Sequence, residues 1–291
     1  MKILCLGSDG MLGSAVIPTL EAANHEVLNT DITLTAHIWL DVRDPKSLDV
    51  HMRSFKPDVV LHLAAETSLE VCEDKPDHAW TTNAIGTKNV ALACRQRDVP
   101  MVYISSAGVF DGQSDQAYTE FDDPCPINVY GASKYAGEKF VRQLVPEHYI
   151  ARAGWMMGGG PLKDKKFVGH ITKQLAKNPG TIRAVCDKRG TPTYSKDFAV
   201  CLESLIQTGR YGTYHMVSPG NVSRYDVACA VVEMLGGDAN VTPCSSAYFA
   251  ADFPAPRPPS ECMRNMVLEL EGNQTMRGWK DALADYLRLW Q

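Results

Sequence analysis

Short apolar runs alternate with longer amphipathic stretches through the first half of the chain. Each apolar run ends near Gly, Ser, Ala or a charged residue, as expected where a strand passes into a loop. The stretches between the runs are long enough to be crossover helices. This alternation is typical of βαβ units and predicts a mostly parallel sheet. The expected strands are Lys2–Leu6, Glu26–Asn29, Val59–Leu63, Met101–Ser105 and Tyr149–Arg152, and the expected helices are Met11–Ala23, Pro45–Phe55, Pro76–Arg95 and Asn128–Leu144.

The pattern changes after Arg152. A run of helix and strand breakers, Gly158-Gly159-Gly160-Pro161, is followed by shorter elements and by the Pro-rich segment Phe253–Pro259. These features predict a loop-rich second lobe. Two of its segments, around Thr181–Val185 and Thr213–Val217, still have the pattern of strands, and we expect them to return to the sheet.

Composition and charge narrow the classes of function. The 291 residues are 45% hydrophobic and 22% charged, which is ordinary for a globular protein. Lys and Arg number 29 against 34 Asp and Glu, so the formal net charge is −5, and no strongly basic stretch favours nucleic acid as a partner. No apolar run approaches the ~20 residues of a membrane span, so we expect no membrane partner.

The nine cysteines are scattered along the chain and form no C-x-x-C pair. This pattern argues against a zinc site, and we expect no metal. We interpret the cysteines as small core side chains of a protein in the reducing cytoplasm.

A glycine-rich segment follows the first expected strand and opens the first expected helix. From Gly7 to Gly13 it has the spacing G-x-x-G-x-x-G, in the context that a dinucleotide-binding turn requires. The first glycine permits a tight turn, Gly10 lets backbone N–H groups approach a pyrophosphate, and Gly13 lets helix and strand pack closely. The segment predicts a dinucleotide site, and a purely structural turn is the alternative.

Two acidic residues are candidates for the adenosine end of such a cofactor. Asp31 ends the second expected strand at about the spacing of a ribose-binding acid, although a strand-end turn would also place an Asp there. Residues 32–37 contain no Arg or Lys to receive a 2′-phosphate, so NAD(H) is favoured and NADP(H) is the alternative. Asp41, followed by Val42, is expected beside the adenine amino group or in a surface turn.

Tyr130 and Lys134 lie four residues apart on one expected helix, so both side chains project from the same face. A lysine ammonium near a phenol stabilises the phenolate and lowers the pKa of the phenol toward neutral pH. Such a pair is also common on amphipathic surface helices. Ser106, however, closes an apolar strand at the carboxyl edge, where open α/β sheets bind ligands. The three residues together predict a site of proton transfer.

With these motifs the chain resembles the extended short-chain dehydrogenase/reductase family and, within it, the branch of the dTDP-4-dehydrorhamnose reductases. Similar segments run from residue 1 to about residue 260 and so cover most of the chain. They include Ala64-Ala65-Glu66-Thr67, Asn83-Ala84, Val109-Phe110-Asp111-Gly112, Arg152-Ala153-Gly154-Trp155, Gly190-Thr191-Pro192-Thr193 and Pro254-Ala255-Pro256-Arg257-Pro258.

The resemblance implies an α/β fold, with a Rossmann-like, doubly wound parallel sheet and a smaller C-terminal substrate-binding lobe. Residues 1–153, with the returning strands near 181–217, would form the dinucleotide-binding domain, and residues 154–180 and 218–291 would form the lobe. It also implies NAD(P)H-dependent reduction of the 4-keto group of a nucleotide-activated deoxysugar. A homodimer is the usual assembly in the family.

The resemblance implies roles for single residues. Tyr130 would give its proton to the sugar C4 carbonyl oxygen, Lys134 would lower the pKa of Tyr130 and hold the nicotinamide ribose, and Ser106 would hydrogen-bond the developing alkoxide. Residues expected to bind the cofactor are Gly7, Gly10, Met11, Leu12, Gly13, Asp31, Asp41, Val42, Ala64, Ala65, Glu66, Thr67, Tyr130 and Lys134. Residues expected to bind the substrate are Ser106, Ala107, Trp155 and Arg257, the last as a cation for a nucleotide diphosphate.

The chain departs from that branch immediately after Ser106. These reductases usually have Asp-Tyr there, whereas this chain has Ala107-Gly108. The change leaves the residues for hydride transfer in place but alters which sugar we expect to fit. It also disfavours a 4,6-dehydratase, which has Asp-Glu at this place. A metal-binding Glu found at a helix start in some reductases has no counterpart at Ala15, so no metal is assigned.

Two alternative functions are left open. A nucleotide-sugar epimerase would use the same three residues with no net redox change. A non-catalytic regulatory subunit would also fit, because the β-subunit of methionine adenosyltransferase resembles these reductases.

Overall fold

The computed structural model describes residues 1–33, 38–177 and 180–291. Its centre is a seven-stranded sheet of order β11-β6-β5-β4-β1-β2-β3, in which every pairing is parallel. The order runs outward from β1 in both directions, as in a doubly wound Rossmann-like sheet, so the predicted fold class is confirmed. The strands are β1 (Lys2–Leu6), β2 (Glu26–Asp31), β3 (Ile38–Trp39), β4 (Val59–His62), β5 (Met101–Ser106), β6 (His148–Ala153) and β11 (Gly212–His215).

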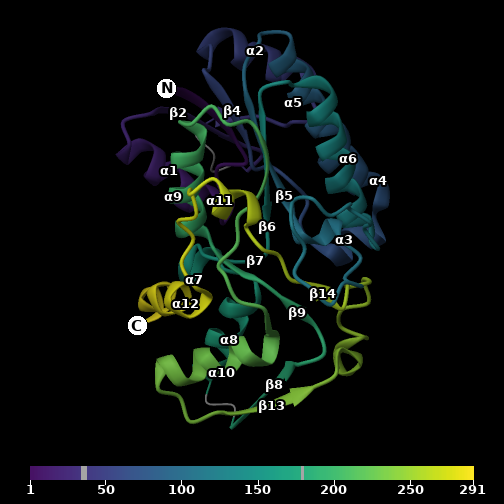
Figure 1. Cartoon of the computed structure of the whole chain (residues 1–291), viewed down its shortest axis with the longest axis vertical. Helices are drawn as coiled ribbons and strands as arrows, with labels where there is room; N and C mark the ends of the chain where they lie inside the picture. The colour runs from purple at the N-terminus through teal and green to yellow at the C-terminus, as the bar shows by residue number, and fades with distance from the viewer. Residues whose placement is uncertain (34–37, 178–179) are drawn as a thin grey trace.

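Helices cover both faces of this sheet (Figure 1). Because successive side chains of a strand point to opposite faces, Ile3 and Cys5 of β1 enter one core, while Leu4 and Leu6 enter the other. Burial on both faces explains why β1 is apolar at four consecutive positions. One layer contains α2 (Pro45–Phe55), α5 (Gly86–Arg95) and α6 (Val129–Leu144), and the other contains α1 (Gly13–Ala22), α9 (Ser195–Ile206) and α11 (Met266–Leu270).

A second lobe lies below the carboxyl ends of the strands in Figure 1. Its own core joins side chains such as Ile171, Ile182, Val231 and Leu283. Its helices are α7 (Gly160–Lys163), α8 (Phe167–Leu175), α10 (Arg224–Leu235) and α12 (Trp279–Leu287). Its strands are β7 (Trp155–Met157) with β10 (Pro192–Tyr194), β8 (Thr181–Val185) with β13 (Asn240–Cys244), and β12 (Val222–Ser223), β9 (Arg189–Gly190) and β14 (Ser260–Glu261).

Of the two segments expected to return to the central sheet, one pairs with it and the other does not. β11 pairs with β6 at the sheet edge, as predicted. The expectation for Thr181–Val185 is wrong, because β8 pairs with β13 in the second lobe. In β8 the buried Ile182 and Ala184 alternate with more exposed residues. A strand with one solvated face has this alternation, whereas a strand inside a doubly covered parallel sheet is apolar on both faces.

Short elements complete the chain between β4 and α5 and after β5. They are α3 (Leu69–Asp74), α4 (Pro76–Ala79), a π-helical turn (Trp80–Ile85) and a 3-10 turn (Ala107–Val109). The single helix predicted over residues 76–95 therefore contains a π-helical turn, a feature that often accompanies functional sites.

Within the described ranges, no helix has both the length and the apolar character that crossing a membrane requires. The nine cysteines are free thiols, and five of them, Cys5, Cys72, Cys94, Cys201 and Cys262, are buried.

Candidate active site

The glycine-rich turn lies between β1 and α1 at the carboxyl edge of the sheet. Gly7 has φ +85°, and a Cβ there would lie 2.6 Å from the backbone nitrogen of Ala64. A Cβ on Gly13 would lie 2.1 Å from the carbonyl oxygen of Ser8. The backbone N–H groups of Met11 and Leu12 have no acceptor among the described residues. A turn with no room for side chains and with free donors at a helix start fits a pyrophosphate.

Asp31 is buried at the end of β2, where its carboxylate supports this turn. Its Oδ2 accepts a hydrogen bond from the backbone N–H of Asp9 at 2.9 Å, and its Oδ1 accepts one from the backbone N–H of Thr33 at 3.1 Å. Residues 34–37, which belong to the cation-free stretch behind the predicted NAD(H) preference, lie outside the described residues.

Asp41 is held by Arg43, a cation that lies beyond the stretch of residues 32–37 without Arg or Lys. The Nε of Arg43 donates to both carboxylate oxygens of Asp41 at 2.9 and 3.0 Å, and its Nη2 donates to Oδ2 at 2.6 Å. This side-chain hydrogen bonding lowers the pKa of Asp41 and keeps it ionised. Val42 is buried beside it and packs against Gly86, where a Cβ would meet the Val42 side chain at 2.8 Å.

The segment Ala64–Thr67 follows β4 and is fixed by a residue of the π-helical turn. The buried Asn83 accepts a hydrogen bond from the backbone N–H of Glu66 at 2.8 Å and donates to the carbonyl oxygen of Glu66 at 3.0 Å. Its amide also donates to Ser133 of α6 at 3.0 Å. Asn83 therefore ties the strand-end segment to the helix that contains Tyr130 and Lys134.

Ser106 and Tyr130 lie together at the carboxyl end of β5. Ser106 lies close enough to Tyr130 to act on its pKa, and Ser106 Oγ accepts a hydrogen bond from the backbone N–H of Gly108 at 3.1 Å. A Cβ on Gly108 would lie 3.4 Å from the Tyr130 ring, and a Cβ on Gly131 would lie 1.9 Å from the carbonyl oxygen of Gly108. Gly131 thus lets the start of α6 approach the 3-10 turn closely, whereas a Cβ on Gly108 would make an ordinary van der Waals contact with the Tyr130 ring. Asn128 caps the helix by accepting a hydrogen bond from the backbone N–H of Gly131 at 2.7 Å.

The protonation of the pair differs from the expectation. Burial raises the pKa of Tyr130 to about 12, and Ser106 opposes this only in part. Burial lowers the pKa of Lys134 to about 7, while the carboxylate of Glu138 opposes that shift. Desolvation favours the neutral form of both groups, so the pKa of Tyr130 is raised and not lowered toward neutral pH, and the effect of Lys134 on it stays a prediction. Tyr130 therefore holds its proton at neutral pH, as a proton donor must.

A buried ion pair lies one helical turn beyond Lys134. Glu138 accepts hydrogen bonds from Nε and Nη2 of Arg152 at 2.9 and 2.8 Å, and Arg142 donates to it at 2.9 Å. Burial disfavours the Glu138 carboxylate, yet these arginines hold its pKa below the usual value. Nη1 of Arg152 lies 3.3 Å from Nε2 of His215. A fixed negative charge therefore stands near the buried Lys134.

Trp155 begins β7 and is held on several sides. Its indole N–H donates to Glu261 at 2.7 Å. Its ring lies against Gly190, where a Cβ would come within 2.2 Å of the indole. The guanidinium carbon of Arg224 lies 3.7 Å from the ring centroid. The aromatic surface is thus fixed in one orientation by residues of the second lobe.

Arg257 ties the Pro-rich segment to α3. Its Nη2 donates to Glu70 at 2.5 Å, and its Nη1 donates to the carbonyl oxygens of Phe253 and Ala255 at 3.3 and 2.8 Å. The cation expected to meet a diphosphate therefore already has a carboxylate partner, and a bound diphosphate would share it.

Lysines of the second lobe reach two of the expected cofactor-binding segments. Nζ of Lys163 donates to the carbonyl oxygen of Asp9 in the glycine-rich turn at 3.0 Å. Nζ of Lys166 donates to Oγ1 of Thr67 at 3.3 Å. The structure therefore brings the second lobe against the carboxyl edge of the sheet.

Sequence reasoning missed several residues of this region. Asn83 was part of a resembling segment but had no role, and Lys166, Arg224 and Glu261 were not singled out. Each of the last three is a charged residue outside any motif, and only the fold brings it near Trp155 or Thr67. Of the missed residues, only Asn83 carried a signal in the sequence.

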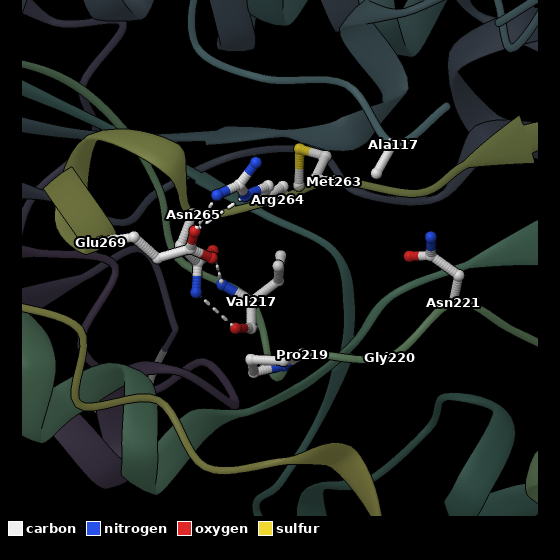
Figure 2. Close-up of a pocket in the computed structure, with 9 residues that line it drawn as sticks. All are labelled: Ala117, Val217, Pro219, Gly220, Asn221, Met263, Arg264, Asn265 and Glu269. Atoms are coloured by element: carbon white, nitrogen blue, oxygen red, sulfur yellow. Dashed lines mark hydrogen bonds and ion pairs between the residues drawn. The ribbon is translucent and has the colours of Figure 1, made fainter. Parts of the chain in front are cut away.

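A separate hollow of about 220 Å³ lies between Ala117, the loop from Val217 to Asn221 and the segment from Met263 to Glu269 (Figure 2). Asn265 lines it and binds the backbone N–H and carbonyl of Val217 at 2.9 and 2.8 Å. None of the nine lining residues belongs to the candidate site, so we assign the hollow no part in its chemistry.

Known proteins resemble the chain over its whole length. The family model of the RmlD substrate binding domain matches residues 1–291. A dTDP-4-dehydrorhamnose reductase of Mycolicibacterium smegmatis is 33% identical over 287 residues, which cover 98% of this chain and 84% of that protein. The crystal structure of a dTDP-4-dehydrorhamnose reductase from Clostridium acetobutylicum has a TM-score of 0.93 and 36% identity, with 100% of both chains covered. The dTDP-4-dehydrorhamnose reductase of Bacillus anthracis, solved in complex with NADP, has a TM-score of 0.91 and 32% identity, covering 100% of this chain and 99% of that one.

Proposed function

The chain belongs to the RmlD substrate binding domain family, and from this premise we propose that it reduces the 4-keto group of a nucleotide-activated deoxysugar. The observation that carries the proposal is the joint placement of Ser106 and Tyr130 at the end of β5, where a Cβ on Gly108 would lie 3.4 Å from the Tyr130 ring and 3.5 Å from Ser106 Oγ. They lie at the same carboxyl edge as the glycine-rich turn, where open α/β sheets bind their ligands.

A bound nicotinamide supplies the hydride in a reduction of this kind. Tyr130 gives its proton to the carbonyl oxygen, and the Ser106 hydroxyl hydrogen-bonds the same oxygen as negative charge develops there. Lys134 holds the nicotinamide ribose from the next turn of α6. The glycine-rich turn binds the pyrophosphate with its backbone N–H groups. Trp155 packs against the sugar.

Cofactor preference is the finer part of the proposal. We favour NADH over NADPH, because a 2′-phosphate near the buried Asp31 would face a carboxylate that already accepts two backbone hydrogen bonds. Dissociation constants of both cofactors, measured by quenching of tryptophan fluorescence, test this preference. If the protein bound NADPH as tightly as NADH, or more tightly, Asp31 would not discriminate against the 2′-phosphate of the ribose.

The activity is tested with a panel of 4-keto sugar nucleotides and either reduced cofactor. Consumption of the cofactor in step with loss of the ketone supports the proposal. Because Ala107 and Gly108 leave the chain without the acid and phenol usual at this place, we expect the 4-keto sugar of rhamnose synthesis to be a poor substrate in the panel. Redox-neutral conversion of a sugar nucleotide would instead indicate an epimerase. No turnover by protein that binds the cofactor would favour a regulatory subunit.

A further inference from the structure

Among the described residues, Arg224 is a cation that no side chain hydrogen-bonds, although the carboxylate of Glu261 is near enough to raise its pKa. It is the first residue of α10, where the capping box between Ser223 and Asp226 fixes the start of the helix. Its guanidinium makes no hydrogen bond or ion pair with any residue in the described part of the chain. Instead it lies between two aromatic rings, 3.7 Å from the centroid of Trp155 and 4.9 Å from that of Phe167.

Two further cations lie close to Arg224. Burial lowers the pKa of Arg224 to about 10, Glu261 opposes the shift, and Arg257 adds to it. Burial also lowers the pKa of Lys166, with Arg224 as the next cause. Three positive side chains from α10, the Pro-rich segment and the start of α8 therefore converge.

These cations differ in how they are paired. Arg257 has the carboxylate of Glu70, and Lys166 has the hydroxyl of Thr67. By comparison, the buried Arg152 makes a bidentate pair with Glu138. A half-buried guanidinium that lacks such a pair has lost water without a compensating bond, and an anionic ligand would supply one.

The stacking of Arg224 leaves its binding groups available. A guanidinium that packs face-on against a ring keeps its five N–H donors in the plane, pointing away from the ring at the edge. That fork matches the geometry of two phosphate oxygens. Trp155, the proposed sugar-binding surface, is the ring on which Arg224 lies, so an anion bound at its edge would be close to the sugar.

We propose that Arg224 directly binds the diphosphate of the nucleotide-sugar substrate, with Arg257 as a second cation that Glu70 holds in position. This inference rests on the proposed function, and it assigns Arg224 as the residue that binds the anionic part of the substrate. Arg224 should not contribute to the binding affinity for a neutral ligand that lacks the diphosphate.

The test compares the wild-type protein with Arg224→Met, which keeps an unbranched apolar stem against Trp155 but removes the charge. Both are saturated with NAD⁺, so that added nucleotide does not enter the cofactor site. Dissociation constants are then measured for dTDP and for thymidine. We expect Arg224→Met to bind dTDP at least tenfold more weakly and thymidine unchanged. Arg288→Met is the matched control, because Arg288 is an exposed arginine of the same lobe outside the candidate site, and it should bind both as wild type does.

The possible outcomes distinguish a failure of the role of Arg224 from a failure of the proposed reductase function. Equal dTDP affinity in wild type and Arg224→Met would overturn the role of Arg224 and leave the proposed function standing. Equal losses for dTDP and thymidine would also overturn it, since Arg224 would then support the shape of the site rather than bind an anion. Wild-type protein that binds NAD⁺ but neither dTDP nor UDP, measured in the same way, would overturn both. Unchanged NAD⁺ affinity shows that the variant is folded.

Discussion

At the scale of single residues, burial decides the protonation of the candidate catalytic pair. A charged group loses solvation in a protein interior, so desolvation raises the pKa of a phenol and lowers that of an amine. Tyr130 and Lys134 follow this rule, with pKa values of about 12 and about 7. The ligand-free site therefore holds a proton on Tyr130 and leaves Lys134 near its point of titration at neutral pH.

Tyr130→Phe removes the transferable proton without changing the ring that packs against Gly108. We expect turnover to fall by about 100-fold or more, the usual contribution of a general acid, while cofactor affinity stays near that of wild type. Steady-state kinetics and a cofactor titration measure the two effects separately. Turnover near that of wild type would mean that another group donates the proton.

Lys134 gives the ligand-free protein a pH dependence of stability with a definite sign. An unfolded lysine holds its proton up to about pH 10.4, whereas folded Lys134 loses it near pH 7. Between these values the unfolded state binds more protons, so the free energy of unfolding rises with pH, by at most about 1.4 kcal/mol per pH unit.

Lys134→Met lacks this contribution, and groups common to both proteins cancel in the comparison. We expect the free energy of unfolding of wild type, relative to the variant, to increase from pH 7 to pH 9 in urea titrations. A difference that stays flat over this range would show that Lys134 remains charged in the folded protein.

At the scale of elements, close contacts between backbones set the position of the site. The start of α6 reaches the 3-10 turn only because Gly131 has no side chain. Gly131 directly follows the predicted Tyr130, yet its role depends on a distance between elements that a sequence does not contain.

Gly131→Ala would place a Cβ 1.9 Å from the carbonyl oxygen of Gly108, so the helix and the turn must separate. We expect a loss of stability of about 1–3 kcal/mol, together with a clear fall in kcat as Tyr130 moves away from Ser106. The control is Gly278→Ala at the start of α12, where a Cβ would lie 3.8 Å from Asp281 and should have little effect. Equal behaviour of the two variants in thermal unfolding and kinetics would contradict the proposed tight contact.

The elements also show where sequence patterns succeed and fail. Strands of the central sheet were predictable because burial on both faces makes consecutive positions apolar, as at Ile3–Leu6 of β1 and Val59–Leu61 of β4. The sheet predicted for β8 is wrong, because a strand pattern alone does not distinguish the two sheets, whereas the alternation of buried and exposed residues in β8 does. Single charged residues such as Arg224 gave no signal, since their neighbours come from segments distant in sequence.

At the scale of the whole molecule, the two lobes meet along the carboxyl edge of the sheet. Lys163 contacts the glycine-rich turn, Lys166 contacts Thr67, and Arg257 contacts α3. The proposed cofactor site lies on the sheet lobe, whereas the proposed sugar site combines Ser106 and Tyr130 of that lobe with Trp155 of the second lobe, and polar contacts hold the two lobes together. The homodimer implied by the family resemblance stays a prediction.

The central claim is that hydride moves from the nicotinamide to C4 of the sugar while Tyr130 supplies the proton. The most direct test supplies cofactor deuterated at the transferable C4 position, together with a 4-keto sugar nucleotide that turns over, and locates the label in the product by NMR. The account predicts one deuterium at C4 of the sugar, formed by wild type and at least about 100-fold more slowly by Tyr130→Phe. A reduced product without deuterium at C4, or equal rates in the two proteins, would contradict it.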